Sequence, residues 1–155
     1  MGRELTPIGV IRTPFATKED APIQGAFRPE AEGTVQVLPE YAEGLRDLEG
    51  FTHLILLYEF DRAAPVELVR QTFLGDVPHG LFATRHPARP NGIGLTVVTL
   101  LGIEGTTLRV GGIDVLDGTP LLDIKPYVPR FDSFPDASEG WLEGAPERPK
   151  PTGRE

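Results

Sequence analysis

The chain has 155 residues, a net charge of −8 and 39% hydrophobic residues. This composition is typical of a single globular domain, and no apolar run approaches the roughly 20 residues that a membrane-spanning helix needs. The chain has no cysteine, which excludes disulfides, zinc-thiolate sites and thiol nucleophiles. The N-terminus has no apolar segment of the kind found in signal peptides, so we expect a cytoplasmic protein.

The 18 glycines and 16 prolines favour short strands and turns over long helices. In chain order, alternation and β-branched residues predict strands at residues 7–12, 33–38, 51–60, 80–84, 93–103, 107–116 and 122–125. A short helix is expected at 39–48, where Tyr41, Leu45 and Leu48 share a face. Residues 66–73 fit a strand or a helix, and residues 15–32 form a long loop of the kind that is often functional.

Most of the predicted elements are strands, and the short connection between 93–103 and 107–116 indicates a hairpin. This pattern predicts a mainly β fold. We expect a small antiparallel β-barrel with one short helix and long loops, and a sandwich is the alternative. The barrel domain is expected to cover residues 1–138. Residues 139–155 are rich in proline and charge, so we expect a poorly ordered tail there, with Trp141 as its one anchor.

The most informative stretch of the chain, residues 117–127, holds two acids, a lysine and a tyrosine within eleven residues. Asp117-Gly118-Thr119-Pro120 has turn chemistry, because glycine permits a positive φ and proline fixes φ and starts the next segment. Alternation along the following strand places Leu122 and Ile124 on one face, and Asp123 and Lys125 on the other. With Tyr127, this gives acceptors, donors and a phenol around one turn and strand end, which indicates a ligand site.

Two further groups are candidates for binding. Arg85, His86 and Arg89 lie within five positions of a loop stiffened by proline, and a solvated loop is the alternative interpretation. Asp61 and Arg62 follow the strand at 51–60, either as ligand contacts or as a capping pair, which we weigh equally.

Other site types are poorly supported. Residues 90–94 resemble a phosphate-binding loop but lack its third glycine. No Gly-x-Ser-x-Gly motif is present, and the three histidines are scattered, so neither an α/β-hydrolase nor a metal site is expected. Asp117 and Asp123 are too close around one turn to make a convincing glycosidase pair.

Several motifs, in order, resemble the TrmO family, also called YaeB or VirR-like. They are residues 8–14, Pro22 with Gln24, and residues 48–54, 82–85, 89–94 and 117–127. This family comprises S-adenosylmethionine-dependent tRNA adenosine N6-methyltransferases, and the resemblance covers residues 5–136. It implies a small, usually dimeric β-barrel that methylates the threonylcarbamoyl-modified adenosine beside the tRNA anticodon. Well-characterised bacterial members have a second, C-terminal domain, so we expect a short form that lacks it.

The resemblance also implies where the cofactor, S-adenosyl-L-methionine, is bound. The family's contacts carry over to Pro22, Gln24, Asp61, Arg62, Arg85, Asp117, Gly118, Thr119 and Pro120. Two positions depart from the family pattern. Ile23 stands where the family commonly has arginine, and Asp61-Arg62 replaces a frequent His-Gln pair.

On the acceptor side, we expect Arg89, Asn91 and Lys125 to bind the substrate, with Arg85 and Arg89 supplying positive charge. Proteins that hold nucleic acid on a broad basic face are usually basic overall. In this acidic chain any RNA contact must therefore be local or be supplied by an oligomer, and we expect a homodimer with shared sites.

Methyl transfer from a sulfonium is an in-line displacement, so the protein mainly aligns donor and acceptor. Tyr127 or Asp123 is expected to orient the acceptor nitrogen or take its proton, and the sequence does not choose between them. Two other functions remain open. One is a regulatory module that binds S-adenosylmethionine, and the other is a methyltransferase acting on a small molecule or protein.

Overall fold

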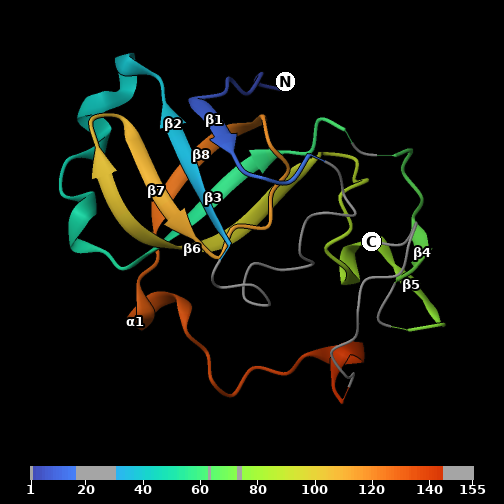
Figure 1. Cartoon of the computed structure of the whole chain (residues 1–155). Coiled ribbons are helices and arrows are strands. Elements are labelled where there is room, and N and C mark those ends of the chain that lie inside the picture. Colours follow the sequence, from blue (N-terminus) through green and yellow to red (C-terminus); the bar gives the residue numbers. More distant parts are fainter. Residues whose placement is uncertain (1, 17–30, 63, 73–74, 145–155) are drawn as a thin grey trace.

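The computed structural model describes residues 2–16, 31–62, 64–72 and 75–144 (Figure 1). Its centre is a closed antiparallel barrel with strand order β1-β2-β7-β6-β3-β8. The barrel strands are β1 (Gly9–Arg12), β2 (Glu32–Val37), β3 (His53–Glu59), β6 (Ile93–Glu104), β7 (Thr107–Gly111) and β8 (Thr119–Pro126). Among the described residues the only α-helix is the four-residue α1 (Pro129–Asp132). The predicted mainly β barrel with one short helix is therefore confirmed.

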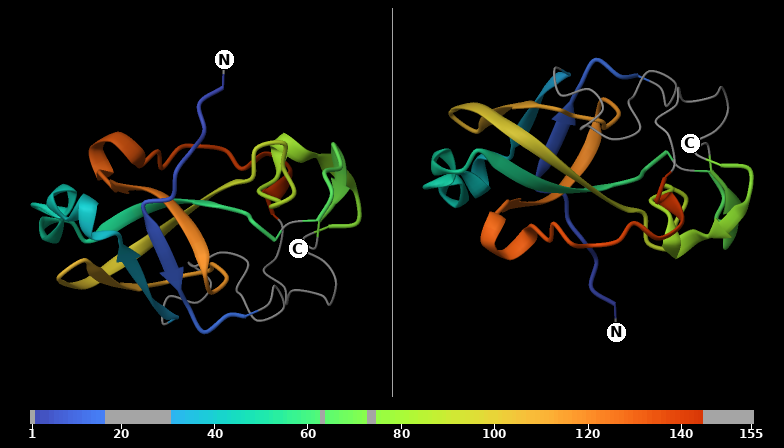
Figure 2. Two further views of the ribbon diagram at one scale, coloured as in Figure 1. Left: turned by 90° about the horizontal axis from the view of Figure 1, so that it is seen from above. Right: turned by 90° about the horizontal axis from the view of Figure 1, so that it is seen from below.

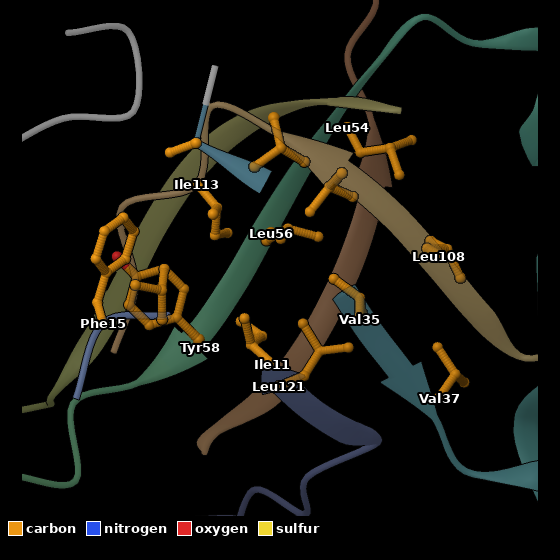
Figure 3. Close-up of a cluster of buried hydrophobic side chains, with 14 of the residues drawn as sticks. Ile11, Phe15, Val35, Val37, Leu54, Leu56, Tyr58, Leu108, Ile113 and Leu121 are labelled. Atoms are coloured by element: carbon orange, nitrogen blue, oxygen red, sulfur yellow. The ribbon is translucent and has the colours of Figure 1, made fainter. Parts of the chain in front are cut away.

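Alternation along the strands fills the barrel. On β3, Leu54, Leu56 and Tyr58 face inward and are buried. Figure 3 shows these side chains converging with Ile11 from β1 and Leu121 from β8. Full burial of such side chains stabilises each by about 1.5–3 kcal/mol relative to exposure, so the barrel interior is the main source of stability.

The segment predicted as a helix at 39–48 is instead two 3-10 turns, η2 (Pro39–Leu45) and η3 (Leu48–Gly50). Asp47 separates them in a left-handed conformation, with φ of 71°. Residues three apart share a face in a 3-10 helix. Leu48 is accordingly buried and Leu45 packs on the core, but Tyr41 is exposed, so the predicted shared face was wrong at that residue.

A two-stranded ribbon projects from the side of the barrel opposite η2 and η3 (Figure 2). It consists of β4 (Val69–Gln71), which resolves the ambiguity at 66–73 in favour of a strand, and β5 (Pro78–Gly80). The strand predicted at 80–84 was wrong. Leu81–Ala83 forms the 3-10 turn η4, because Leu81 is buried and the backbone N–H and hydroxyl of Thr84 both bond to the Leu81 carbonyl.

Two strand predictions need adjustment near the turn at 117–120. β7 ends at Gly111, well before residue 116, because Gly112 has a positive φ of 71°. In β8 the register against β3 shifts between Asp123 and Leu121, so Leu122 is an additional residue at a bulge. Beside this bulge Leu121 lies in the core and Ile124 packs against it, so the prediction that Leu122 shares a face with Ile124 was wrong.

After β8 the chain forms α1 and then a 3-10 turn, η5 (Gly140–Leu142). The Trp141 ring stacks on His79 of β5, with 4.0 Å between ring centroids, and its Nε1 donates to the Ala83 carbonyl at 2.8 Å. Trp141 thus attaches this segment to the ribbon, in the anchoring role predicted for it. Whether residues 139–155 as a whole form a poorly ordered tail stays a prediction, since 145–155 lie outside the described residues.

Candidate functional site

The turn at 116–119 is held by β1 and by the chain segment that follows it. The backbone N–H groups of Asp117 and Gly118 donate to the carbonyls of Phe15 and Ile11, each at 2.8 Å. The Asp117 carboxylate accepts from the Thr13 N–H at 3.1 Å. Gly118 has φ of 82°, which explains the glycine at this position. The predicted turn is confirmed, but the bond from the aspartate reaches a segment 104 residues away.

Arg62 connects this turn to the end of β3. Its Nη2 donates to the Asp117 carbonyl at 2.8 Å and to the Thr119 hydroxyl at 3.2 Å. Its Nε pairs with Asp61 at 3.3 Å. The Thr119 hydroxyl in turn donates to the Leu116 carbonyl at 2.7 Å. Arg62 therefore does more than pair with Asp61 at the strand end, because its two bonds to Asp117 and Thr119 brace the turn at 117–120.

Polar side chains at this end of the barrel are open to solvent. The exposed fractions of the Asp61, Arg62 and Asp117 side chains are 39%, 42% and 43%. The Arg12 guanidinium lies 3.9 Å from the second oxygen of Asp117. Two carboxylates and two guanidiniums thus meet where the barrel strands end, and all four are accessible to a ligand.

A buried tyrosine links the same end of the barrel to the loop between η4 and β6. Burial is the main cause that raises the pKa of the Tyr58 hydroxyl, and the negative charge of Asp114 raises that pKa further. Arg85 acts in the opposite direction, which places its charge within electrostatic reach of the hydroxyl. Arg85 itself is exposed at the surface.

The loop at 84–92 is tightly organised. Arg89 Nη1 donates to the carbonyls of Thr84 and His86 at 2.9 and 3.1 Å. His86 is buried, and its Nδ1 accepts from the Ala88 N–H at 3.0 Å. Asn91 is exposed at the start of β6, next to Gly92, whose carbonyl accepts from the Phe60 N–H at 2.7 Å. Arg89 therefore organises the loop, and Asn91 lies near the end of β3.

The structure places Asp123, Lys125 and Tyr127 away from this site. Asp123 and Lys125 form an ion pair at 3.0 Å, and pair in register with Leu57 and Ile55 of β3. Tyr127 lies beyond the far end of β8, where its ring meets His53 edge to face at 6.2 Å between ring centroids. At roughly 3.3 Å per residue, the eight steps from Thr119 to Tyr127 span at most about 26 Å. In Figure 1, α1, just after Tyr127, lies on the opposite side of the barrel from the end of β1.

The predicted site residues thus fall into two groups. One end of the barrel gathers Asp61, Arg62, Arg85, Asn91, Asp117, Gly118, Thr119 and Pro120, with Arg89 in the adjoining loop. Pro22 and Gln24 lie outside the described residues. Sequence reasoning missed Arg12, Thr13, Tyr58 and Asp114, although Arg12 and Thr13 belong to the motif at 8–14, which was noticed without a role.

The hydrogen-bond donors and acceptors at this end of the barrel suit S-adenosylmethionine. Ionised carboxylates only accept hydrogen bonds, so Asp61 and Asp117 match ribose hydroxyls or an ammonium group. Arg62 uses Nε and Nη2 within the protein, so its Nη1 N–H groups are the ones that could donate to a carboxylate. In the described parts of the chain, no three His, Cys, Asp or Glu side chains gather to hold a metal ion.

Comparison with known proteins defines the class to which this barrel and site belong. The model of the tRNA-methyltransferase O (TrmO) N-terminal domain matches residues 10–133. The crystal structure of TrmO from Pseudomonas aeruginosa aligns with a TM-score of 0.81 and 44% identity, covering 95% of this chain and 66% of that one. The chain belongs to the TrmO family, which confirms the resemblance inferred from its motifs.

Curated relatives agree with this assignment. A probable S-adenosyl-L-methionine-binding protein of Pyrococcus abyssi is 52% identical over 137 residues, which cover 88% of this chain and 74% of the relative. The tRNA (adenine(37)-N6)-methyltransferase of Escherichia coli is 38% identical over 149 residues, covering 90% and 63%. The expectation of an S-adenosylmethionine-dependent methyltransferase is confirmed at the level of the family.

The chain spans about two thirds of the length of the bacterial relatives, 63% of the E. coli enzyme and 66% of the P. aeruginosa structure. Within the described parts of the chain, no helix combines the length and apolar character that crossing a membrane requires.

Proposed function

We propose that this protein transfers a methyl group from S-adenosylmethionine to N6 of the threonylcarbamoyl-modified adenosine beside the tRNA anticodon, in the cytoplasm. The observation that carries the proposal is the turn at 117–120, which Arg62 and the segment after β1 hold at a solvent-exposed end of the barrel. The family resemblance implies that this turn contacts the cofactor, and the family includes an E. coli tRNA adenine N6-methyltransferase.

When bound, S-adenosylmethionine supplies a methyl group already activated by a positive sulfonium. The residues described here provide position and electrostatics. Asp61 and Asp117 present acceptors for hydroxyl or ammonium groups, while Arg62 presents donors for a carboxylate. Because the turn is bonded on both sides before a ligand arrives, little ordering is required on binding, and such preorganisation favours alignment of donor and acceptor.

We further propose that the protein is a homodimer. The outer faces of β3 and β6 carry the pairs Ile55–Val97 and Leu57–Leu95, of which Leu95 and Val97 are 45% and 40% exposed. This continuous apolar patch lies on the sheet face opposite the barrel interior. A two-fold axis through the patch would cover it with the same patch of a second chain.

A dimer of this kind accounts for the separation of the predicted catalytic residues. Asp123 and Lys125 flank the apolar patch on β8, next to Leu57 and Ile55. They and Tyr127 would then lie at or near the interface, where they contribute to the site of the partner subunit. We propose that Tyr127 or Asp123 orients the acceptor nitrogen at the partner subunit's site or takes its proton. Arg89, Asn91 and Lys125 are proposed to contact the substrate.

Incubation with methyl-labelled S-adenosylmethionine and separate acceptor pools tests the proposed function. Label in tRNA supports it. Label in protein or small molecules instead supports the alternative methyltransferase, and binding of the cofactor without transfer to any pool supports a regulatory module. Free enzyme with no acceptor is the control for self-methylation.

A further inference from the structure

Among the residues that the structure describes, Phe82 is the most exposed large apolar side chain, with 76% of its surface accessible. Its neighbour Leu81 is 1% exposed, so η4 (Leu81–Ala83) turns one side chain into the protein and the other outward. The turn is well fixed. The Thr84 N–H and hydroxyl both donate to the Leu81 carbonyl, at 3.0 and 2.8 Å, and Trp141 donates to the Ala83 carbonyl. The Phe82 ring is held outward by this turn, so it contributes little to the core, and packing does not explain an aromatic residue at this position.

A guanidinium accompanies this ring. The Arg89 Cζ lies 5.9 Å from the centre of the Phe82 ring, within the range of a cation–π contact. Two carbonyls hold the Arg89 guanidinium in place, so its position does not depend on the ring. Arg89 approaches the ring while leaving most of its surface open, and the pair forms a small aromatic and cationic surface.

A second arginine, Arg85, lies in the same loop as this surface. Arg85, three residues after Phe82, is exposed and lies within electrostatic reach of Tyr58 at the end of the barrel. Phe82 and Arg85 therefore belong to one loop whose charge reaches the Tyr58 end of the barrel. In a chain of net charge −8, two arginines here form a local basic surface.

We propose that Phe82 is a stacking platform for an unpaired nucleobase of the RNA substrate, with Arg89 and Arg85 facing the adjacent backbone. The proposal rests on the proposed function and adds a specific substrate contact to it. Bases splayed out of RNA loops characteristically stack on aromatic rings and guanidinium planes. An apolar protein partner is the competing occupant, because Leu68 and Val69 are also exposed. The paired guanidinium favours a base, which brings both a π-face and a phosphate.

The test uses an RNA stem-loop with the sequence of a tRNA anticodon arm, in which 2-aminopurine replaces one unpaired loop base. Stacking quenches the fluorescence of this base analogue. Wild type, Phe82→Leu and Phe82→Tyr are titrated against it, and calorimetry gives the affinity of each variant for S-adenosylmethionine. Phe134→Leu is the matched control, because Phe134 is 72% exposed but lies in the C-terminal segment.

We expect Phe82→Leu to lose the quenching and to weaken RNA binding about 5- to 160-fold, since base–aromatic stacking contributes about 1–3 kcal/mol. Phe82→Tyr should retain both, and cofactor affinity should not change. Equal RNA binding and quenching by wild type and Phe82→Leu would overturn the proposal. So would the same loss in Phe134→Leu, weaker cofactor binding by Phe82→Leu, or no RNA binding by wild type.

The two proposals can fail separately. If wild type methylates tRNA and Phe82→Leu behaves identically, the stacking role fails and the proposed function stands. If wild type quenches the analogue through Phe82 but transfers no methyl group, the proposed function fails and the stacking role stands.

Discussion

At the scale of single residues, Arg62 and Asp117 stabilise the turn at 117–120 and are also the proposed contacts to the cofactor. Asp117 accepts a bond from Thr13, and its carbonyl accepts one from Arg62, so both residues shape the turn that they also expose to a ligand. Sequence reasoning identified the aspartate from the turn chemistry around it. It could not identify Thr13 as its partner, because that contact joins residues far apart in the chain and has no local signature.

Two substitutions of Asp117 should separate the effect of its hydrogen bond to Thr13 from the effect of its negative charge. Asp117→Ala removes both the acceptor for Thr13 and the negative charge, and we expect cofactor affinity to fall about 10- to 100-fold, since bonds to charged groups contribute about 1.5–3 kcal/mol. Asp117→Asn keeps an acceptor oxygen, so it should preserve the turn and lose affinity through charge alone. Calorimetric titration measures both. Arg46→Ala, on the turn at the opposite side of the barrel, is the control, and unchanged affinity in Asp117→Ala would remove the residue from the site.

Tyr58 makes a prediction about pH. Its pKa is raised above the ordinary value of 10.0, so the folded chain keeps this proton at a pH where the unfolded chain loses it. The unfolded state is then favoured as pH rises past 10, by about 1.4 kcal/mol per pH unit for this one group. Urea unfolding from pH 8 to about 11.5 should show a steeper alkaline loss in wild type than in Tyr58→Phe. Parallel curves for the two proteins would contradict this role.

At the scale of elements, the sequence predicted the parts that alternation controls. The strands at 33–38 and 51–60 appear as β2 and β3 because apolar residues recur on the face toward the barrel. The strand at 93–103 appears as β6, whose buried positions are Gly94, Thr96 and Val98. The errors lie where single contacts override the pattern. A buried Leu81 and a bonded Thr84 turn a predicted strand into η4, and an additional residue at Leu122 shifts the faces of β8.

The pairing of Tyr58 with Gly94 provides a test of how β3 and β6 pack. A Cβ at Gly94 would collide with the Tyr58 ring and approach the Phe60 ring. Forced overpacking typically costs about 1–3 kcal/mol, so Gly94→Ala should lower the free energy of unfolding by that amount. Urea titration measures the change. Gly102→Ala on the same strand is the control, because its Cβ would meet only the end of Arg109 at 4.0 Å. Equal stability of the two variants would mean that Tyr58 packs elsewhere.

At the scale of the whole molecule, the separation between the turn at 117–120 and Tyr127 is the main feature to explain. Sequence proximity placed Asp117, Asp123 and Tyr127 at one site, but β8 carries them apart along the length of the barrel. The strand predicted at 122–125 was too short to show this separation, because β8 runs from Thr119 to Pro126. In the proposed dimer, Tyr127 and Asp123 of one subunit lie beside the turn at 117–120 of the other subunit.

Subunit complementation tests this arrangement. Asp117→Ala and Tyr127→Phe should each lower methyl transfer, the second without loss of cofactor binding. When the two variants are mixed and allowed to exchange subunits, the mixed dimer has one site with both residues intact. About a quarter of wild-type activity should return if each site is shared across a two-fold axis. Sedimentation confirms the dimer, and a mixture no more active than its components would show that each site lies within one chain.

The most direct test of the central claim is the fate of the methyl group on tRNA. Purified protein is incubated with S-adenosylmethionine and tRNA that carries threonylcarbamoyladenosine, and the tRNA is digested to nucleosides for mass spectrometry. We predict that the threonylcarbamoyladenosine nucleoside gains the mass of one methyl group, and that tRNA lacking the threonylcarbamoyl group gains none. Unmodified nucleosides in the presence of protein that demonstrably binds S-adenosylmethionine would contradict the proposed function.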